Sequence, residues 1–242
     1  MQPTYTVIIP CYNEEKYIED TLIKIQEYFD ERHPLYEIIV VDDKSTDDTV
    51  EIVNSYILNK RDGKVRMLFN DVNRGKGYSV KQGLISGNGE YFLITDADLS
   101  SPISQFDNLL HYVRTYDFVL GSRKHSLSIV KKKQPLIRRI YSKGFNIIVN
   151  TLFNLGVSDT QCGFVLISSN LKKLIISCSK IYGFSYTIEY LLIVIKNNLK
   201  FLEVGIVWND NKPQSVNFKQ IKEMFFDLLK IKNLYNLGVY EW

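Results

Sequence analysis

The chain is poor in cysteine and in long apolar runs, and both shortages restrict what it can be. Its three cysteines are odd in number and show no CxxC spacing, which disfavours a disulfide framework and a zinc site and suits a reducing compartment. No stretch reaches the roughly 18 apolar residues that span a bilayer, and the N-terminus lacks a basic segment followed by a long apolar core. We therefore expect a cytoplasmic protein that is not integral to a membrane.

The chain also lacks a large net charge. Its 30 basic and 27 acidic residues leave a formal charge of +3, so affinity for phosphates or anionic lipid must come from local clusters, and nucleic acid is not an expected partner. The three histidines are scattered and receive no catalytic role. With 242 residues, 45% of them hydrophobic, the chain can build one substantial core, so a single α/β domain over residues 1–242 is expected.

Short apolar runs alternate with helical patterns along the first half of the chain. We expect strands at residues 5–10, 37–41, 65–69, 91–95 and 118–121, and helices at 14–29, 48–59, 76–85 and 102–114. This alternation predicts a mostly parallel, nucleotide-binding sheet flanked by helices. Beyond residue 124 we expect helices at 135–155, 185–197 and 217–232, and strands near 163–167 and 201–208. Residues 1–123 would bind the nucleotide, and residues 124–242 would specify the second substrate.

Carboxylates are concentrated where two of the expected strands end. Asp42 and Asp43 follow four apolar residues, and Asp96 and Asp98 follow another apolar run. The carboxyl ends of neighbouring parallel strands face one crevice, where α/β sheets place ligands. Buried carboxylates lose hydration unless they receive donors or a cation, and a base N–H and ribose hydroxyls would supply donors to the first pair. The pattern indicates a nucleotide and a divalent cation.

Asp96 and Asp98 are the candidate ligands for that cation. Mg²⁺ or Mn²⁺ prefers oxygen ligands, and one or two carboxylates often suffice when substrate phosphates and water complete the shell. The cation would neutralise charge developing on a departing nucleoside diphosphate. Because a DxD pair is common by chance, an ordinary surface turn is the alternative for this segment taken alone.

Two loops that precede expected helices have both structural and functional interpretations. After Pro10, Asn13 can cap the first helix, and Glu14 suits the positive end of that helix. Arg74 and Lys76 lie in a glycine-containing turn that opens another helix, where positive charge suits a diphosphate. Basic turns with glycine are common, so this second signal is weak.

The order of these elements resembles that of the family-2 glycosyltransferases with the GT-A fold. The resemblance spans nearly the whole chain, and it is greatest to the group of dolichyl-phosphate β-glucosyltransferases and polyprenyl-phosphate glycosyltransferases. The matching segments are Val7-Ile8-Ile9-Pro10 to Asn13-Glu14-Glu15, Asp42-Asp43 with Ser45, Asp47 and Thr49, Asn73-Arg74-Gly75-Lys76-Gly77, Asp96-Ala97-Asp98, Gly121-Ser122-Arg123, Asp159-Thr160-Gln161-Cys162-Gly163-Phe164, Glu203-Val204 and Trp208.

The resemblance implies roles for the matching residues on the donor side. Asp42 would contact the base, and Asp96 and Asp98 would hold Mg²⁺ or Mn²⁺ on the diphosphate. The residues implied to bind the nucleotide sugar are Pro10, Tyr12, Glu14, Asp42, Asp43, Ser45, Arg74, Lys76 and Asp96.

On the acceptor side, the resemblance implies that Arg123, Arg138 and Ser142 bind the phosphate of a lipid. Arg138 and Ser142 are four residues apart on an expected helix, so they share one face. A solvated basic face is the alternative for Arg138 and its neighbour Arg139. Catalytic roles are implied for Asp98, Asp159 and Arg123. Whether Asp159 orients a substrate, stabilises positive charge at the anomeric centre or removes a proton stays open.

The implied reaction is an inverting, metal-dependent transfer of glucose from UDP-glucose to dolichyl or polyprenyl phosphate. A phosphate monoester, with a second pKa of about 6, is already largely anionic near neutrality, so it needs cationic guidance more than a general base. Three alternatives stay open: mannose transfer from GDP-mannose to a polyprenyl phosphate, transfer to a glycan hydroxyl, and a non-catalytic nucleotide-sugar-binding protein.

A lipid acceptor predicts peripheral attachment to a membrane surface, at its cytosolic face. Lys131, Lys132 and Lys133 form either a solvated loop or a juxtamembrane cluster, in which each cation contributes about 1 kcal/mol. The segment 218–234 has apolar residues at near-helical spacing, so it suits packing on the core, the default, or an interfacial position.

The chain departs from the family pattern at two places. Thr187 stands where relatives often carry an acidic residue, and Gln214-Ser215-Val216 stands near a position where they tend to carry a Gly-Ser-Lys-like segment. Acceptor contacts from the second segment are therefore not assigned.

Overall fold

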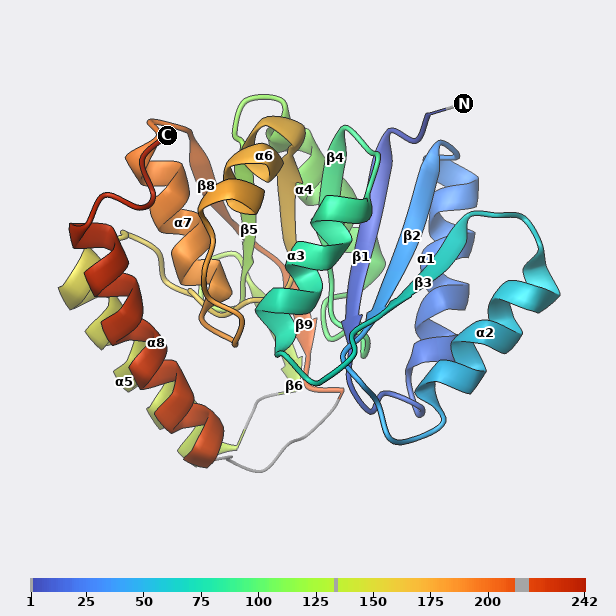
Figure 1. The fold of residues 1–242 in the computed structure, drawn as a ribbon, viewed down its shortest axis with the longest axis horizontal. Helices are drawn as coiled ribbons and strands as arrows, with labels where there is room; N and C mark the ends of the chain where they lie inside the picture. Colours follow the sequence, from blue (N-terminus) through green and yellow to red (C-terminus); the bar gives the residue numbers. More distant parts are fainter. Residues whose placement is uncertain (1, 133–134, 212–217) are drawn as a thin grey trace.

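A seven-stranded sheet forms the centre of the computed structural model, which describes residues 2–132, 135–211 and 218–242 (Figure 1). Its strand order is β3-β2-β1-β4-β7-β5-β8. The strands are β1 (Tyr5–Cys11), β2 (Tyr36–Asp42), β3 (Val65–Phe69), β4 (Tyr91–Ile94), β5 (Phe118–Ser122), β7 (Val165–Ser168) and β8 (Phe201–Gly205). All neighbours run parallel except β7, which is antiparallel to both β4 and β5. The expected mostly parallel α/β sheet is confirmed.

Helices cover both faces of this sheet. In Figure 1, α3, α6 and α7 lie in front of the strands, and α1 and α4 lie behind them. The bounds of these helices, and of α2, are α1 (Ile18–Arg32), α2 (Thr49–Lys60), α3 (Lys76–Ser86), α4 (Phe106–Val113), α6 (Ser169–Cys178) and α7 (Tyr186–Lys196). The 3₁₀ turn η1 (Ile103–Gln105) precedes α4. Because both faces of the central strands are covered, Val7, Ile8 and Ile9 of β1 are fully buried, which explains the continuous apolar runs in the sequence.

Two long helices stand together at one edge of the molecule. In Figure 1, α5 (Leu136–Phe153) and α8 (Phe218–Asn236) lie side by side. Their rings meet at two levels, with centroids 6.0 Å apart for Phe145 and Phe225 and 6.3 Å apart for Phe153 and Tyr235. One face of α8 packs on the core through buried residues, whereas Phe226 and Leu229 stay exposed. Packing on the core, the expected default, is therefore confirmed for one face of α8, and an interfacial position for the other face stays a prediction.

The second half of the chain differs from the prediction in three elements. The expected strand at 201–208 is wrong as one strand, because β8 ends at Gly205 and β9 (Val207–Asn209) leaves the sheet to pair in parallel with β6 (Ile129–Lys132). Neither β6 nor α6 was predicted. Lys133 and the segment 212–217, with its Gln214-Ser215-Val216, lie outside the described residues.

Candidate active site

The loops that follow β1 and β2 are tied together by hydrogen bonds. Asn13 has a left-handed backbone, with φ of 56°, its amide donates to Ser45 Oγ at 3.0 Å, and its Oδ1 accepts from the amide of Thr46 at 2.8 Å. The prediction that Asn13 caps the first helix is therefore wrong: α1 begins at Ile18, and Asn13 joins two loops of the crevice. The amide of Glu14 similarly donates to Thr49 Oγ1 at 2.8 Å.

The remaining residues expected on the donor side lie along this same crevice. Pro10 pairs with Val41 in the sheet, and Tyr12, directly beyond β1, is 46% exposed. The buried carboxylate of Asp42 accepts from the backbone amides of Lys44 and Ser45, each at 3.1 Å. These contacts place the predicted donor residues at one edge of the sheet, where the parallel strands β1 and β2 end.

Asp43 receives three donors from the segment after β3. Its carboxylate accepts from Asn70 Nδ2 at 2.8 Å, from the amide of Arg74 at 2.9 Å and from the amide of Gly75 at 2.7 Å. The chain therefore supplies the donors that the sequence analysis sought from a base and a ribose. Asp43 fixes the turn that contains Arg74, whose own side chain pairs with Asp71 on the surface.

Asp96 and Asp98 follow β4 at the carboxyl edge of the sheet. Lys76, the first residue of α3, donates from Nζ to Asp96 Oδ1. Asp98 accepts from the amide and the hydroxyl of Ser100, each at 2.9 Å. Burial and the neighbouring charge of Asp96 raise the pKa of Asp98 even though these bonds to Ser100 oppose the shift. Two close carboxylates, one of them poorly solvated, are arranged to gain from a cation.

The donor set fits magnesium or manganese better than a metal held by protein alone. Within the described residues there is no group of three or more His, Cys, Asp or Glu side chains that could hold a metal ion. Mg²⁺ and Mn²⁺ are often held by one or two carboxylates together with substrate phosphates and water. Asp96 and Asp98 supply two such carboxylates, and Gly163 lets the Asp96 carboxylate approach, because a Cβ there would lie 2.6 Å from both of its oxygens.

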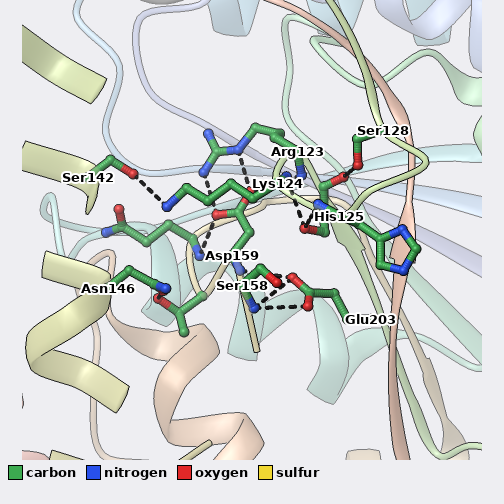
Figure 2. Close-up of polar contacts among 12 residues, drawn as sticks. Arg123, Lys124, His125, Ser128, Ser142, Asn146, Ser158, Asp159 and Glu203 are labelled. Atoms are coloured by element: carbon green, nitrogen blue, oxygen red, sulfur yellow. Dashed lines mark hydrogen bonds and ion pairs between the residues drawn. The ribbon is translucent and has the colours of Figure 1, made fainter. Parts of the chain in front are cut away.

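Arg123 and Asp159 form a largely buried ion pair (Figure 2). Arg123 also interacts electrostatically with Asp96. Arg123 donates from Nε at 2.6 Å and from Nη2 at 2.7 Å to the two oxygens of Asp159. Burial alone would raise the pKa of Asp159, but the charge and hydrogen bonds of Arg123 outweigh it and lower that pKa to about 2. Asp159 is therefore ionised near neutrality, and its two hydrogen bonds hold Arg123 in place.

Two further residues hold this pair in place. Glu203 of β8 accepts from the amides of Ser158 and Asp159, at 2.9 and 2.8 Å, so it anchors the turn that carries Asp159 (Figure 2). The guanidinium carbon of Arg123 lies 5.5 Å from the ring centroid of Trp208. From the sequence, Glu203 and Trp208 could be recognised only as parts of segments that match the family. No local pattern pairs Glu203 with Ser158, 45 positions away, or Trp208 with Arg123, 85 positions away.

α5 brings Ser142 and Arg138 close to the site, where Lys124 from the loop after β5 joins them. Ser142 Oγ lies 3.2 Å from Lys124 Nζ, which reaches across from the loop after β5 (Figure 2). Arg138 Nη1 is buried, has no hydrogen-bond partner among the described residues and lies 3.8 Å from Oδ1 of the buried Asp210. Burial lowers the pKa of Arg138 although Asp210 acts against that shift. A buried donor without a partner is unfavourable, so Arg138 is suited to an anionic ligand.

A cavity of about 450 Å³ lies between α5, α8 and this site. Its polar lining includes Lys76, Arg123 and Arg138, and no carboxylate lines it among the described residues. Its apolar walls are Ile140, Tyr141, Phe145 and Ile148 of α5, Phe184 of the loop before α7, and Ile221, Met224 and Phe225 of α8. The structure therefore joins the predicted acceptor residues Arg123, Arg138 and Ser142 in one chamber, which has a cationic group of side chains and mostly apolar walls.

The apolar walls of this cavity were not predicted from the sequence. On α5 a signal existed, because Arg138, Tyr141, Ser142, Phe145 and Ile148 recur at the three- and four-residue spacing of one helix face. The contribution of α8 had no such signal, since its pairing with α5 joins segments about 80 positions apart.

Solved structures of glucosyl-3-phosphoglycerate synthase from Mycobacterium tuberculosis share this architecture. One, in complex with Mn²⁺, UDP-glucose and phosphoglyceric acid, matches with a TM-score of 0.71 over 96% of this chain and 80% of that chain, at 19% identity. The likeness shows the fold, and with the geometry of the site it defines a GT-A glycosyltransferase. Residues 6–174 match the model of Glycosyl transferase family 2, and the chain belongs to that family.

Proteins named dolichyl-phosphate β-glucosyltransferase resemble this chain along nearly its whole length. The protein from Dictyostelium discoideum is 32% identical over 248 residues, which cover 98% of this chain and 76% of the relative. The proteins from Mus musculus and Saccharomyces cerevisiae are each 29% identical, covering 97% of this chain and 76% of the relative. The resemblance stated from the sequence is confirmed.

Proposed function

We propose that the chain transfers glucose from UDP-glucose to dolichyl or polyprenyl phosphate, with inversion at the anomeric carbon. The observation that carries this proposal is the cavity, which has a cationic group of side chains and mostly apolar walls. A polyprenyl phosphate has the same division between an anionic head and an apolar chain. The similarity to dolichyl-phosphate β-glucosyltransferases supports both the sugar and the acceptor.

Donor binding falls to the crevice at the ends of β1, β2 and β4. Asp42 and the loops tied by Asn13 would receive the nucleoside, and Asp96 and Asp98 would hold Mg²⁺ or Mn²⁺ on its diphosphate. The bound cation supplies charge neutralisation for the leaving nucleoside diphosphate. Asp98, which burial and Asp96 make a poorly stabilised anion, would gain most from that cation.

The acceptor needs orientation more than activation. Its phosphate would lie against Arg123, Arg138 and Ser142, from where an anionic oxygen can attack the sugar from the side opposite to the leaving group. Because Arg123 lowers the pKa of Asp159 to about 2, Asp159 would be a weak proton acceptor near neutrality. We assign Asp159 the role of positioning Arg123, and through it the acceptor phosphate.

The edge formed by α5 and α8 is the surface that we propose to rest on a membrane at its cytosolic face. Exposed apolar patches of this kind mark interaction sites. Within the described residues, no helix has both the length and the apolar content needed to cross a bilayer. The apolar residues of the edge that are between 58% and 67% exposed are Leu136, Ile137, Ile140 and Ile147 of α5 and Phe226 and Leu229 of α8.

A direct assay tests the proposed reaction. Purified protein is incubated with Mg²⁺ or Mn²⁺, a panel of labelled UDP- and GDP-sugars, and a short-chain polyprenyl phosphate. We expect a labelled, β-linked lipid product from UDP-glucose and its loss when the metal is chelated. If product forms only from GDP-mannose, the proposed donor is wrong. If transfer occurs only to oligosaccharide hydroxyls, the proposed acceptor is wrong. Binding of nucleotide sugars without any product would refute catalysis.

A further inference from the structure

Lys76 stands beside the carboxylate that the proposed cation would need. Its Nζ donates to Asp96 Oδ1, so a side-chain ammonium balances the charge of the Asp96 carboxylate. Lys76 also lines the acceptor cavity with Arg123 and Arg138, and its side chain is 21% exposed. One ammonium therefore lies between the metal carboxylate and the chamber for the acceptor phosphate.

The backbone around Lys76 is fixed, whereas its side chain can turn. Gly75 has φ of 97°, and a Cβ on it would lie 2.6 Å from the carbonyl oxygen of Tyr182. A Cβ on Gly77 would lie 2.7 Å from the Cβ of Tyr186. The two glycines thus let the start of α3 pack tightly on the loop before α7. From this anchored backbone only the flexible four-carbon stem of Lys76 can carry its charge elsewhere.

We propose that Lys76 is an exchangeable counter-ion: it holds Asp96 until the metal and donor arrive, and then turns toward the acceptor phosphate in the cavity. The inference rests on the proposed metal site. A divalent cation on Asp96 repels the ammonium at close range, which supplies the direction of the exchange. By linkage, the metal-bound nucleotide then strengthens acceptor binding, and the acceptor strengthens nucleotide binding by the same factor.

Binding of Mn²⁺ alone provides the first test. Lys76→Met removes the competing ammonium. We therefore expect this variant to bind Mn²⁺, in the absence of nucleotide, about tenfold more tightly than the unsubstituted protein does. Electron paramagnetic resonance measures this binding. Lys81→Met is the matched control, because Lys81 lies on the same helix but donates to the carbonyl of Ser179. Unchanged or weaker Mn²⁺ binding in Lys76→Met would overturn the inference.

Coupling between the two substrates provides the second test. Binding of geranylgeranyl phosphate is measured by calorimetry with and without Mn²⁺ and UDP. We expect the unsubstituted protein to bind this lipid more tightly when both are present, and Lys76→Met to lose that gain. Equal gains in the two proteins would refute the exchange.

The outcomes separate this inference from the proposed function. If the unsubstituted protein binds no UDP in the presence of Mn²⁺, the proposed donor site is refuted. If UDP binds normally but Lys76→Met leaves the affinity for Mn²⁺ unaltered, only the proposed role of Lys76 is refuted. Circular dichroism and thermal unfolding verify the fold of each variant. Lys76→Gln, which keeps a polar group of similar length, replaces Lys76→Met in both tests if the latter does not fold.

Discussion

Arg123 and Asp159 show how single residues set the chemistry of the site. Asp159 is almost fully buried, and its two oxygens take both arms of the guanidinium in a bidentate pair. Such geometry fixes the plane of an arginine, which is what a tetrahedral phosphate needs from it. This geometry supports our proposal that the pair orients a cation at the cavity rather than supplying a base.

Asp159→Asn should lower stability in a manner that depends on pH. Losing one partner of a largely buried pair leaves the other charge uncompensated, so we expect a loss of about 3 kcal/mol in the free energy of unfolding at pH 7. The folded-state pKa of Asp159 is lowered from 3.8 to about 2, so its contribution is complete above about pH 4 and disappears as the pH falls toward 2. Urea unfolding at several pH values should show the two proteins converging at low pH. A difference that stays constant down to pH 2 would contradict the assignment.

Asp98→Ala should abolish transfer and leave the fold intact. It removes a proposed metal ligand but little core volume, so we expect turnover to fall at least about 100-fold and the free energy of unfolding to change by less than about 1 kcal/mol. Transfer assays and thermal unfolding measure the two effects. Asp20→Ala on the exposed face of α1 is the control. Near-normal turnover in Asp98→Ala would remove Asp98 from the mechanism.

Arg138→Ala should weaken use of the acceptor while sparing the donor. In the part of the chain that the structure describes, the buried Nη1 of Arg138 has no hydrogen-bond partner, and we assign it to the acceptor phosphate. We expect the KM for polyprenyl phosphate to rise about tenfold, as loss of a charge-assisted hydrogen bond predicts, with the KM for UDP-glucose unchanged. Arg139→Ala is the matched control, since Arg139 is adjacent and exposed but does not line the acceptor cavity. Equal effects of the two substitutions would argue for a general basic surface instead.

Sequence reasoning located the carboxylates and arginines but not their partners. Asp42, Asp43, Asp96 and Asp98 follow strands, and strand ends can be read from a local pattern. The donors to Asp43 come from a loop 27 to 32 positions away, and Glu203, the anchor of Asp159, lies on β8, 44 positions away. Only the packed fold brings these residues together. The sequence alone therefore suggests that the Asp43 carboxylate needs hydrogen-bond donors from a ligand, whereas in the folded chain Asn70, Arg74 and Gly75 supply them.

Among the elements, α5 and α8 carry the apolar surface. Their inner faces line the cavity, and their outer faces leave large apolar side chains in solvent. A lipid acceptor could thus pass from a bilayer into the chamber without crossing water, if this edge lies on the membrane. Chamber and membrane contact would then be two faces of one helix pair.

Charged substitutions on this outer face should release the protein from lipid vesicles. We expect Ile137→Asp combined with Phe226→Asp to reduce sedimentation with phosphatidylcholine–phosphatidylserine vesicles at least about tenfold, because two exposed apolar side chains are replaced by anions. Neither residue lines the acceptor cavity, so UDP binding should persist. Leu58→Asp on α2, where Leu58 is 65% exposed, is the control and should sediment normally. Full retention of the double variant on vesicles would exclude this edge as the docking surface.

The elements that sequence reasoning missed are those that depend on distant partners. β6 reads as a basic loop because its strand character comes only from pairing with β9, which lies about 75 positions later. β9 in turn appeared as the end of β8, since both belong to one apolar run. Four of the first five strands, β1, β2, β4 and β5, were predictable because each is a short apolar run buried in the sheet. The edge strand β3 is only partly buried, and its apolar residues still marked it as a strand.

At the scale of the whole molecule, ligand binding should raise thermal stability. A ligand that binds only the folded chain stabilises it by about 2.7 kcal/mol at 100 times its Kd. We therefore expect UDP-glucose to raise the Tm in the presence of Mn²⁺ and to have little effect with a chelator, as measured by differential scanning calorimetry. GDP-mannose serves as the comparison. An equal rise with and without Mn²⁺ would argue against a metal-bound diphosphate.

The antiparallel strand β7 has a consequence for how the acceptor specificity of such an enzyme can evolve. It belongs to residues 124–242, yet it is inserted between β4 and β5 of residues 1–123. A chimaera that borrowed its C-terminal half from another transferase would have to rebuild the middle of the sheet, along with the turn that presses Gly163 against Asp96. New acceptor preferences would therefore arise more readily by point substitutions on α5 and α8 than by recombination of halves.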